Sequence, residues 1–256
     1  MSIRPGLCSV TFRTLEPAAV AALAADAGLR VIEWGGDVHV PPGDTARAAQ
    51  VGRITADAGL EVCSYGSYFR AGVGEDIAPV LDSAEALGAD RIRVWAGAIG
   101  SADATAAQRT GIIDGLARAA EQAGKRGISL ALEFHGRTLA DDAAETLRVL
   151  DEVGSPNLST YWQPTVSAPD VVALAEYERI AERVSAVHVF SWWPATERLT
   201  LTARDGLWRA FFTAAAAAPA PPRDALLEFV PEDAPEALAA EAAALRGYLA
   251  GEAPTG

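Results

Sequence analysis

The sequence predicts an α/β protein built as a single (β/α)8 TIM barrel that spans residues 1–256. Short apolar runs rich in β-branched residues alternate along the chain with alanine-rich stretches of helical periodicity. Glycine follows several of these helical stretches directly, where it favours a helix end. Eight such units in 256 residues match the usual length of this barrel.

The eight apolar runs are expected to be parallel strands, because strands that alternate with helices form β-α-β units. In chain order they are Leu7–Phe12, Arg30–Trp34, Leu60–Tyr65, Ala89–Trp95, Ile128–Phe134, Leu158–Gln163, Val184–Phe190 and Leu226–Val230. The helices between and after them are Leu15–Ala27, three stretches that end near Ala58, Leu87 and Arg126, then Asp141–Val153, Asp170–Arg183, Leu207–Ala218 and Pro235–Leu249. A doubly wound open sheet is the alternative, but it often has a glycine-rich first turn, and residues 11–14 contain no glycine.

Composition excludes several classes of protein. The chain has 21 basic and 34 acidic residues, for a net charge of −13, whereas proteins that hold a nucleic-acid backbone need a basic face. No apolar run approaches the roughly 20 residues of a membrane span, and no signal-peptide pattern is present. Cys8 and Cys63 lie in apolar runs and do not form a C-x-x-C pair. We therefore expect a reduced, cytoplasmic protein with a small-molecule partner, no nucleic acid and no membrane, and we leave homo-oligomerisation open.

The candidate metal ligands lie at the ends of the predicted strands, where barrels of this kind hold their active sites. Glu133 and Glu228 are lone carboxylates in apolar runs, and such a charge is costly to bury unless it is paired or bound to a metal. Gln163 and His188 belong to the two runs between them. Three oxygen donors and one imidazole suit a single divalent ion, with Mn²⁺ as the first choice and Mg²⁺, Co²⁺ or Zn²⁺ as alternatives.

A second set of residues is predicted to bind the substrate. It consists of His39, His135, Arg93, Trp95, Trp34 and Tyr65. Arg93 and Trp95 share one face of their strand, and the alternative for Arg93 is an internal ion pair with Glu33. A core position is the alternative for the tryptophans. The segment from Ser191 to Asp205 is the longest polar insertion and is expected to be a lid.

Over essentially its whole length the chain resembles the xylose isomerase-like TIM-barrel superfamily of sugar isomerases and epimerases. The matching pieces are Val31-Ile32-Glu33-Trp34, Glu133-Phe134-His135-Gly136, Val187-His188-Val189-Phe190 and Leu227-Glu228-Phe229-Val230. The resemblance implies one divalent metal held by Glu, Asp, His and Glu from strands five to eight, with both glutamates also acting as acid and base. Glu133, His188 and Glu228 match that pattern. Gln163 stands where the family has aspartate, which lowers the charge of the ligand set by one.

These residues fit a divalent-metal-dependent isomerase or epimerase of a small sugar or polyol hydroxy-carbonyl compound. One glutamate would remove a proton α to the carbonyl, and the other would return one to the enediolate that the metal stabilises. A keto-polyol dehydratase (a lyase) uses the same chemistry, and a glycosidase with Glu133 and Glu228 as its carboxylate pair is a further alternative. Three histidines and the net charge of −13 disfavour a DNA-repair endonuclease. A non-catalytic barrel subunit stays open because of Gln163.

Overall fold

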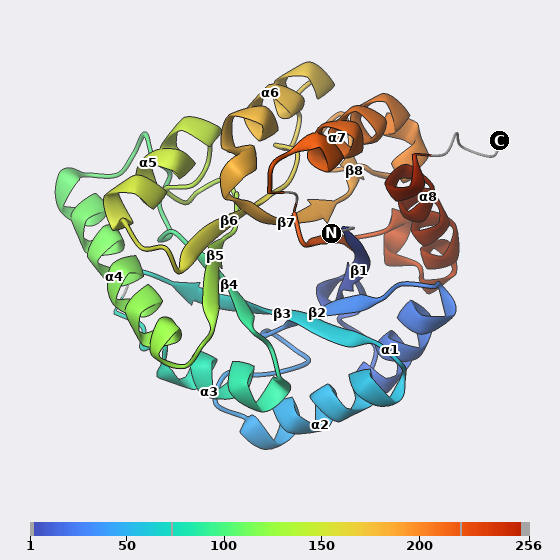
Figure 1. The fold of residues 1–256 in the computed structure, drawn as a ribbon, viewed down its shortest axis with the longest axis horizontal. Coiled ribbons are helices and arrows are strands. Elements are labelled where there is room, and N and C mark those ends of the chain that lie inside the picture. Colours follow the sequence, from blue (N-terminus) through green and yellow to red (C-terminus); the bar gives the residue numbers. More distant parts are fainter. Residues whose placement is uncertain (1–2, 73, 221, 252–256) are drawn as a thin grey trace.

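The chain forms the predicted barrel, with parallel strands closed into a ring and helices around the outside (Figure 1). This computed structural model describes residues 3–72, 74–220 and 222–251, so the other residues of the predicted domain lie outside the described ranges. Around the ring the strand order is β1-β10-β7-β6-β5-β4-β3-β2. The strands are β1 (Arg4–Cys8), β2 (Val31–Gly35), β3 (Glu61–Arg70), β4 (Arg91–Trp95), β5 (Ser129–Leu132), β6 (Leu158–Trp162), β7 (Val184–Val189) and β10 (Asp224–Leu227).

The helices begin and end at residues whose chemistry explains the boundary. Helix α4 begins with a capping box in which Thr105 and Gln108 satisfy each other's backbone N–H groups. Helices α3 and α5 end at Gly88 and Gly154, both in the left-handed conformation. The α-helices are α1 (Pro17–Asp26), α2 (Thr45–Asp57), α3 (Ala78–Leu87), α4 (Ala106–Lys125), α5 (Ala143–Val153), α6 (Asp170–Ile180), α7 (Asp205–Ala217) and α8 (Leu238–Ala250). Short 3-10 helices are η1 (Ser9–Phe12), η2 (Ala181–Arg183), η3 (Leu201–Arg204), η4 (Pro231–Asp233) and η5 (Pro235–Ala237).

Two of the eight strands lie earlier in the chain than the apolar runs predicted. Strand β1 ends at Cys8, and the expected continuation to Phe12 is a 3-10 helix. Strand β10 begins at Asp224, a fully buried carboxylate in contact with arginines, and ends at Leu227. Hydropathy does not register a strand residue that is buried through ion pairs, so the prediction began too late. As a result Glu228 follows the strand instead of lying inside it.

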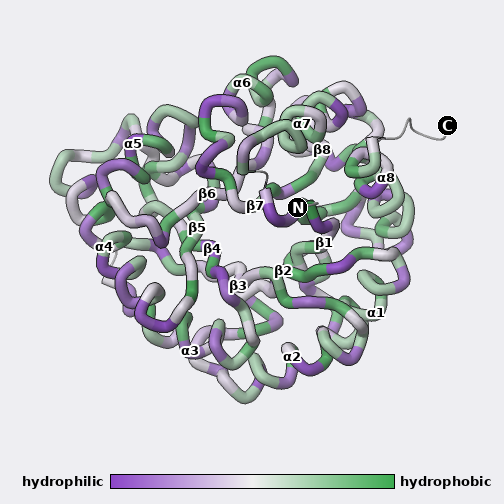
Figure 2. The backbone as a smooth tube through the Cα atoms, in the orientation of Figure 1, coloured by the Kyte–Doolittle hydropathy of each residue, from purple (hydrophilic) through white to green (hydrophobic). Residues whose placement is uncertain are grey.

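Apolar side chains fill the layer between the strands and the helices. Figure 2 shows hydrophobic stretches in both the strands and the surrounding helices, with hydrophilic residues between them. In this layer the rings of Trp162 and Phe211 stack with centroids 4.8 Å apart. A separate small cluster, which includes Cys8, Tyr161 and Leu226, packs inside the ring of strands. Both cysteines, Cys8 and Cys63, are free and buried, in keeping with their place in apolar runs.

The segment predicted as a lid contains a small hairpin. Strands β8 (Ser191–Trp192) and β9 (Arg198–Leu199) pair antiparallel between β7 and α7. The indole of Trp208 in α7 donates a hydrogen bond to Ser191 Oγ at 3.0 Å, which attaches the base of the hairpin to the helix layer. Within the described residues, no helix combines the length and the apolar character that crossing a bilayer would need.

Candidate metal centre

The four predicted metal ligands meet at the carboxyl-terminal end of the barrel. Glu133, Gln163 and Glu228 each come directly after the last residue of β5, β6 and β10, and His188 lies within β7. All four side chains belong to buried residues. Because parallel strands all end at the same side of the ring, residues far apart in the sequence are brought to one point.

Acceptor atoms crowd one nitrogen of His188. Its Nδ1 lies 2.9 Å from Gln163 Oε1 and 3.3 Å from Glu228 Oε2. Ligand atoms of Glu133, His188 and Glu228 all lie within 4.8 Å of one another. Carboxylate and amide oxygens accept hydrogen bonds, and an unprotonated ring nitrogen does the same. The chemistry of this buried set therefore fits a divalent cation, which oxygen ligands and one imidazole can hold.

The buried charges of the site also fit a dication. Glu33, Glu133, Glu228 and Arg93 are all less than 9% exposed, and when ionised they leave two uncompensated negative charges. Burying such an excess is costly unless a cation balances it. A neutral amide at Gln163 keeps the excess at two, which one divalent ion neutralises.

Arg93 and Trp95 hold Glu133 from one side. Trp95 Nε1 donates to Glu133 Oε2 at 2.5 Å, and Arg93 Nη1 donates to the same oxygen. The other carboxylate oxygen of Glu133 is thereby left for a ligand or a substrate proton. Arg93 Nε also donates to Glu33 Oε1 at 2.9 Å, so the predicted internal ion pair is confirmed. Arg93 pairs with two carboxylates and orients them, so the structure places it in an internal ion-pair network instead of the predicted contact with the substrate.

His135 lies beside this group, as part of the aromatic wall of the opening. Its ring stacks on Trp95 with centroids 4.8 Å apart and an interplanar angle of 21°. Burial lowers the pKa of His135, which favours the neutral imidazole. His135 and Trp95 are therefore the predicted substrate contacts that the structure places at the site.

Two predicted substrate contacts lie on the wrong face of their strands. Trp34 and Tyr65 are fully buried, and Trp34 Nε1 donates to Thr55 Oγ1 in α2. The Tyr65 hydroxyl donates to a backbone carbonyl in the loop after β2. Their neighbours Glu33 and Ser64 point into the barrel, so alternation along the strand turns Trp34 and Tyr65 outward. The prediction that they contact the substrate is therefore corrected.

His39 is also held away from the opening. Its ring nitrogens lie 2.9 Å from Ser9 Oγ and 3.0 Å from the backbone oxygen of Leu15. Burial lowers the pKa of His39. The ring connects two loops and is 1% exposed, so its predicted contact with the substrate is corrected as well.

Comparison with known proteins identifies the family. The family model described as xylose isomerase-like TIM barrel matches residues 21–246. The chain belongs to this family.

Several solved structures share the fold of this family member. The probable 3-DHS dehydratase AsbF involved in petrobactin synthesis, from Bacillus anthracis, is 18% identical with a TM-score of 0.80, and the match covers 95% of this chain and 99% of AsbF. A putative xylose isomerase from Rhodospirillum rubrum is 16% identical with a TM-score of 0.77, covering 98% and 100%. An L-ribulose 3-epimerase is 18% identical with a TM-score of 0.68, covering 97% and 93%. A search of curated proteins finds no match.

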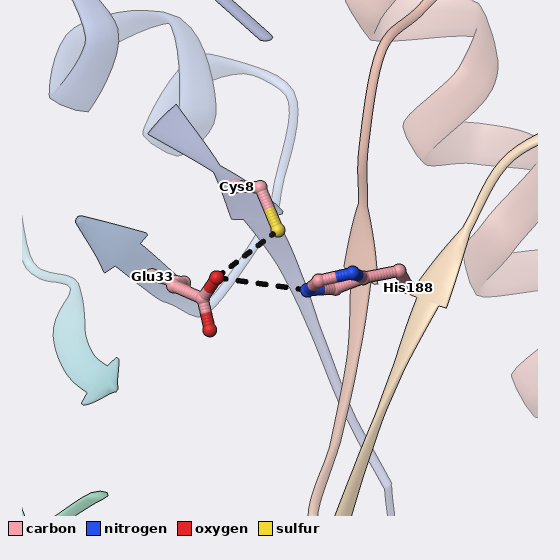
Figure 3. Close-up of side chains that lie close together, drawn as sticks. All are labelled: Cys8, Glu33 and His188. Atoms are coloured by element: carbon pink, nitrogen blue, oxygen red, sulfur yellow. Dashed lines mark hydrogen bonds and ion pairs between the residues drawn. The ribbon is translucent and has the colours of Figure 1, made fainter. Parts of the chain in front are cut away.

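Sequence reasoning missed two neighbours of the centre, Cys8 and Ser64. Figure 3 shows Cys8, Glu33 and His188 facing one another, with Cys8 Sγ 3.9 Å and His188 Nε2 3.6 Å from Glu33 Oε1. Burial raises the pKa of the Cys8 thiol, and the charges of Glu33 and Glu228 raise it further. The thiol therefore stays protonated. Alternation from Glu33 would not have revealed either residue, because both lie on other strands.

A cavity of about 510 Å³ opens beside the centre, between the loops that follow β5 and β6. His135, Arg137 and Gln163 line it, and Thr196 contributes from the 191–205 segment. A small molecule in this cavity would reach Gln163. It also places the predicted lid segment at the edge of the entry path.

Proposed function

We propose that this protein is a divalent-metal-dependent isomerase or epimerase of a small sugar-like or polyol-like hydroxy-carbonyl compound. The convergence of His188 Nδ1, Gln163 Oε1 and Glu228 Oε2, with Glu133 beside them, carries the proposal. Family membership supports it, since structural relatives are named L-ribulose 3-epimerase and D-psicose 3-epimerase.

In this proposal Glu133, Gln163, His188 and Glu228 would hold the cation. We expect Mn²⁺ first, because three oxygen donors outnumber the single imidazole. When bound, the cation supplies electrostatic stabilisation for negative charge on the oxygen atoms of the substrate. The protein's own part is to exclude water from a set of ligands that are each at most 8% exposed.

The two glutamates would share the proton transfers. Glu133 and Glu228 follow β5 and β10, which are separated in the ring by β6 and β7, so a substrate between them presents a different face to each. One carboxylate takes the proton α to the carbonyl, and an enediolate forms. The other returns a proton to the same carbon for epimerisation, or to the neighbouring carbon for isomerisation. Trp95 and His135 offer the apolar face of the sugar an aromatic surface.

A dehydratase is the second candidate, and the structural similarity to AsbF at a TM-score of 0.80 favours it. The first step is the same removal of a proton α to a carbonyl. The enolate then expels the hydroxyl on the next carbon, which leaves as water after accepting a proton from the second carboxylate. The product is a conjugated enone, whereas an isomerase or epimerase retains every atom of its substrate.

Elemental analysis of the purified protein tests the proposal. We expect one equivalent of metal in the wild type, and its loss in Glu228→Ala and His188→Ala. Glu178→Ala, which removes an exposed carboxylate of α6, is the control and should keep the metal. Incubation with ketoses in D₂O should then give deuterium exchange for an epimerase or isomerase, and new ultraviolet absorption for a dehydratase. A wild-type protein that holds no metal even after addition of Mn²⁺ would contradict the proposal.

A further inference from the structure

His188 stands between two groups of acceptors. On one side Nδ1 faces Gln163 and Glu228, and on the other side Nε2 faces Glu33 Oε1 at 3.6 Å. The ring is fully buried, and within the described residues no acceptor lies at hydrogen-bond distance from Nε2, so Glu33 Oε1 is the acceptor that Nε2 faces. A neutral imidazole carries a single N–H, so the ring can donate a hydrogen bond to only one of these two groups of acceptors. Which side it is decides where a cation can bind.

The carboxylate of Glu33 is held as an obligate acceptor. Arg93 Nε donates to its Oε1 at 2.9 Å, and Ser64 Oγ donates to its Oε2 at 2.6 Å. Both oxygens of Glu33 thus face a proton donor, and one of these donors is a permanent guanidinium cation, which favours the ionised carboxylate. An ionised carboxylate has no proton to give.

The backbone is also shaped around this carboxylate. The register of β2 against β3 shifts after Ile32, so Ser64 instead of Cys63 lies opposite Glu33. Such bulges re-aim side chains next to active sites. At Gly66 a Cβ would lie 2.8 Å from Glu33 Oε1 and 2.9 Å from Arg93 Nη2. The absence of a side chain there leaves room for the ion pair.

We propose that Glu33 is a positioning residue for the metal centre: it accepts the Nε2 proton of His188 and so keeps the Nδ1 lone pair directed at Gln163 and Glu228. This inference rests on the proposed function, because it assigns the cation to the Nδ1 side. Carboxylates that fix the tautomer of a metal-binding histidine in this way are common around metal sites. Glu33 touches neither the cation nor the substrate in this role.

The same geometry argues against a cation between Cys8, Glu33 and His188, although their ligand atoms also lie within 4.8 Å of one another. Arg93 Nε is 2.9 Å from Glu33 Oε1, the oxygen that such a cation would need. A guanidinium at that distance repels a dication, and the Cys8 thiol keeps its proton. The geometry thus favours the N–H of His188 at Nε2, facing Glu33, and the cation at Nδ1, facing Gln163 and Glu228.

Histidine side-chain NMR tests the assignment directly, because the chain has only three histidines. Long-range ¹H–¹⁵N correlation distinguishes the two tautomers, and the variants His39→Gln and His135→Gln identify the remaining signal as that of His188. With Mg²⁺ as a diamagnetic probe, we expect the wild-type ring to carry its proton on Nε2. In Glu33→Gln we expect a mixture of tautomers. A wild-type ring protonated on Nδ1 with Mg²⁺ present would overturn the inference.

Metal affinity provides the second measurement. We expect Glu33→Gln to weaken Mn²⁺ binding by about tenfold to a hundredfold, the usual effect of losing an orienting partner. Glu61→Gln, which removes a glutamate paired with Arg4 at the opposite end of the barrel, should leave both tautomer and affinity unchanged. Ser64→Ala covers the case in which Glu33→Gln does not fold, because it keeps the carboxylate and removes one of its anchors. Unchanged tautomer and affinity in folded Glu33→Gln, or in Ser64→Ala when Glu33→Gln does not fold, would overturn the inference.

The same measurements distinguish failure of the proposed function from failure of the role assigned to Glu33. If the wild type binds no Mn²⁺, the metal centre is refuted, while the tautomer of His188 in the metal-free protein still reports on Glu33. If Co²⁺ binds and gives a thiolate charge-transfer band that disappears in Cys8→Ser, the cation lies on the Nε2 side. That result would overturn the inference and leave metal binding itself intact.

Discussion

A single side chain, Arg93, orients two of the buried carboxylates of the candidate metal centre. It contacts Glu33 from β2 and Glu133 from β5, and it is 3% exposed. The planar guanidinium donates along several fixed directions, so one side chain can hold two carboxylates at once. A lysine has no such fork, although it would carry the same charge. Glu133, one of the predicted ligands, is therefore oriented by an arginine that the family pattern alone did not assign.

Asp37 at the rim of the barrel links stability to pH. Burial opposes its ionisation, but the hydrogen bond from Arg13 at 2.5 Å and the arginine's charge outweigh this, so the pKa of Asp37 is lowered. A lowered pKa in the folded state contributes stability above the unfolded-state pKa of about 3.9, and that stability is lost as the pH falls towards the folded-state value.

We therefore expect Asp37→Asn to reduce the free energy of unfolding at pH 7 by up to about 1 kcal/mol, since Arg13 is partly exposed. The difference from the wild type should shrink as the pH falls below about 4. Urea unfolding of both proteins across this range measures it. A difference that stays constant down to the lowest pH would show that the ion pair does not account for the loss.

The cluster of Glu133, His188 and Glu228 could be predicted from sequence because a charged or polar residue in an apolar run is conspicuous. Trp34 and Tyr65 were assigned wrongly for a related reason. An aromatic residue near a strand end can line the pocket or pack against the helices. Which of the two it does depends on whether its side chain points into the barrel or outward. If Glu33 points into the barrel, alternation along the strand points its neighbour Trp34 outward, which excludes Trp34 from the pocket.

At the scale of elements, glycine was the most informative signal. The helix ends predicted at Leu87 and Val153 agree with the structure, because Gly88 and Gly154 adopt the left-handed conformation that favours glycine. The hairpin formed by residues 191–199 was not predicted, since its strands have two residues each and such short strands have no detectable period. The start of β10 was missed because Asp224 is buried by ion pairs.

Packing between helices gives the prediction that belongs to this scale. Gly52 of α2 lies against α3, where a Cβ would be 2.6 Å from the backbone oxygen of Leu87. Because a backbone atom cannot move aside as a side chain can, we expect Gly52→Ala to lower the free energy of unfolding by about 1–3 kcal/mol. Denaturant unfolding measures the effect.

The matched control is Gly247→Ala in α8. This glycine is also helical, but among the described residues nothing outside its own stretch of helix lies within 4 Å of the position that a Cβ would take. Alanine favours the helix over glycine by about 1 kcal/mol, so the variant should be more stable than the wild type. Equal effects of the two substitutions would mean that contact with Leu87 does not set the tolerance at Gly52.

Inside the ring of strands, the molecule divides its buried charges between the two ends of the barrel. The carboxyl-terminal end holds three carboxylates and one arginine, an imbalance that suits a cation. At the amino-terminal end the buried Asp224 is balanced by the buried Arg91, whose Nη2 lies 2.5 Å away, and it also lies 2.7 Å from Arg4 Nη2 and 3.3 Å from Arg223 Nε. In barrels of this type the first end serves catalysis and the second serves stability.

Asp224→Asn tests this division. Asp224 and Arg91 are 0% and 2% exposed, so the substitution leaves a buried guanidinium without its counter-charge. Breaking a buried pair in this way costs about 3–5 kcal/mol, which should appear as a lower midpoint of denaturant unfolding. Asp90→Asn removes an exposed partner of Arg223 and should cost less than about 1 kcal/mol. Mn²⁺ affinity of folded Asp224→Asn should match the wild type, because its ligands lie at the other end. Weakened metal binding without a loss of stability would mean that the two ends are not independent.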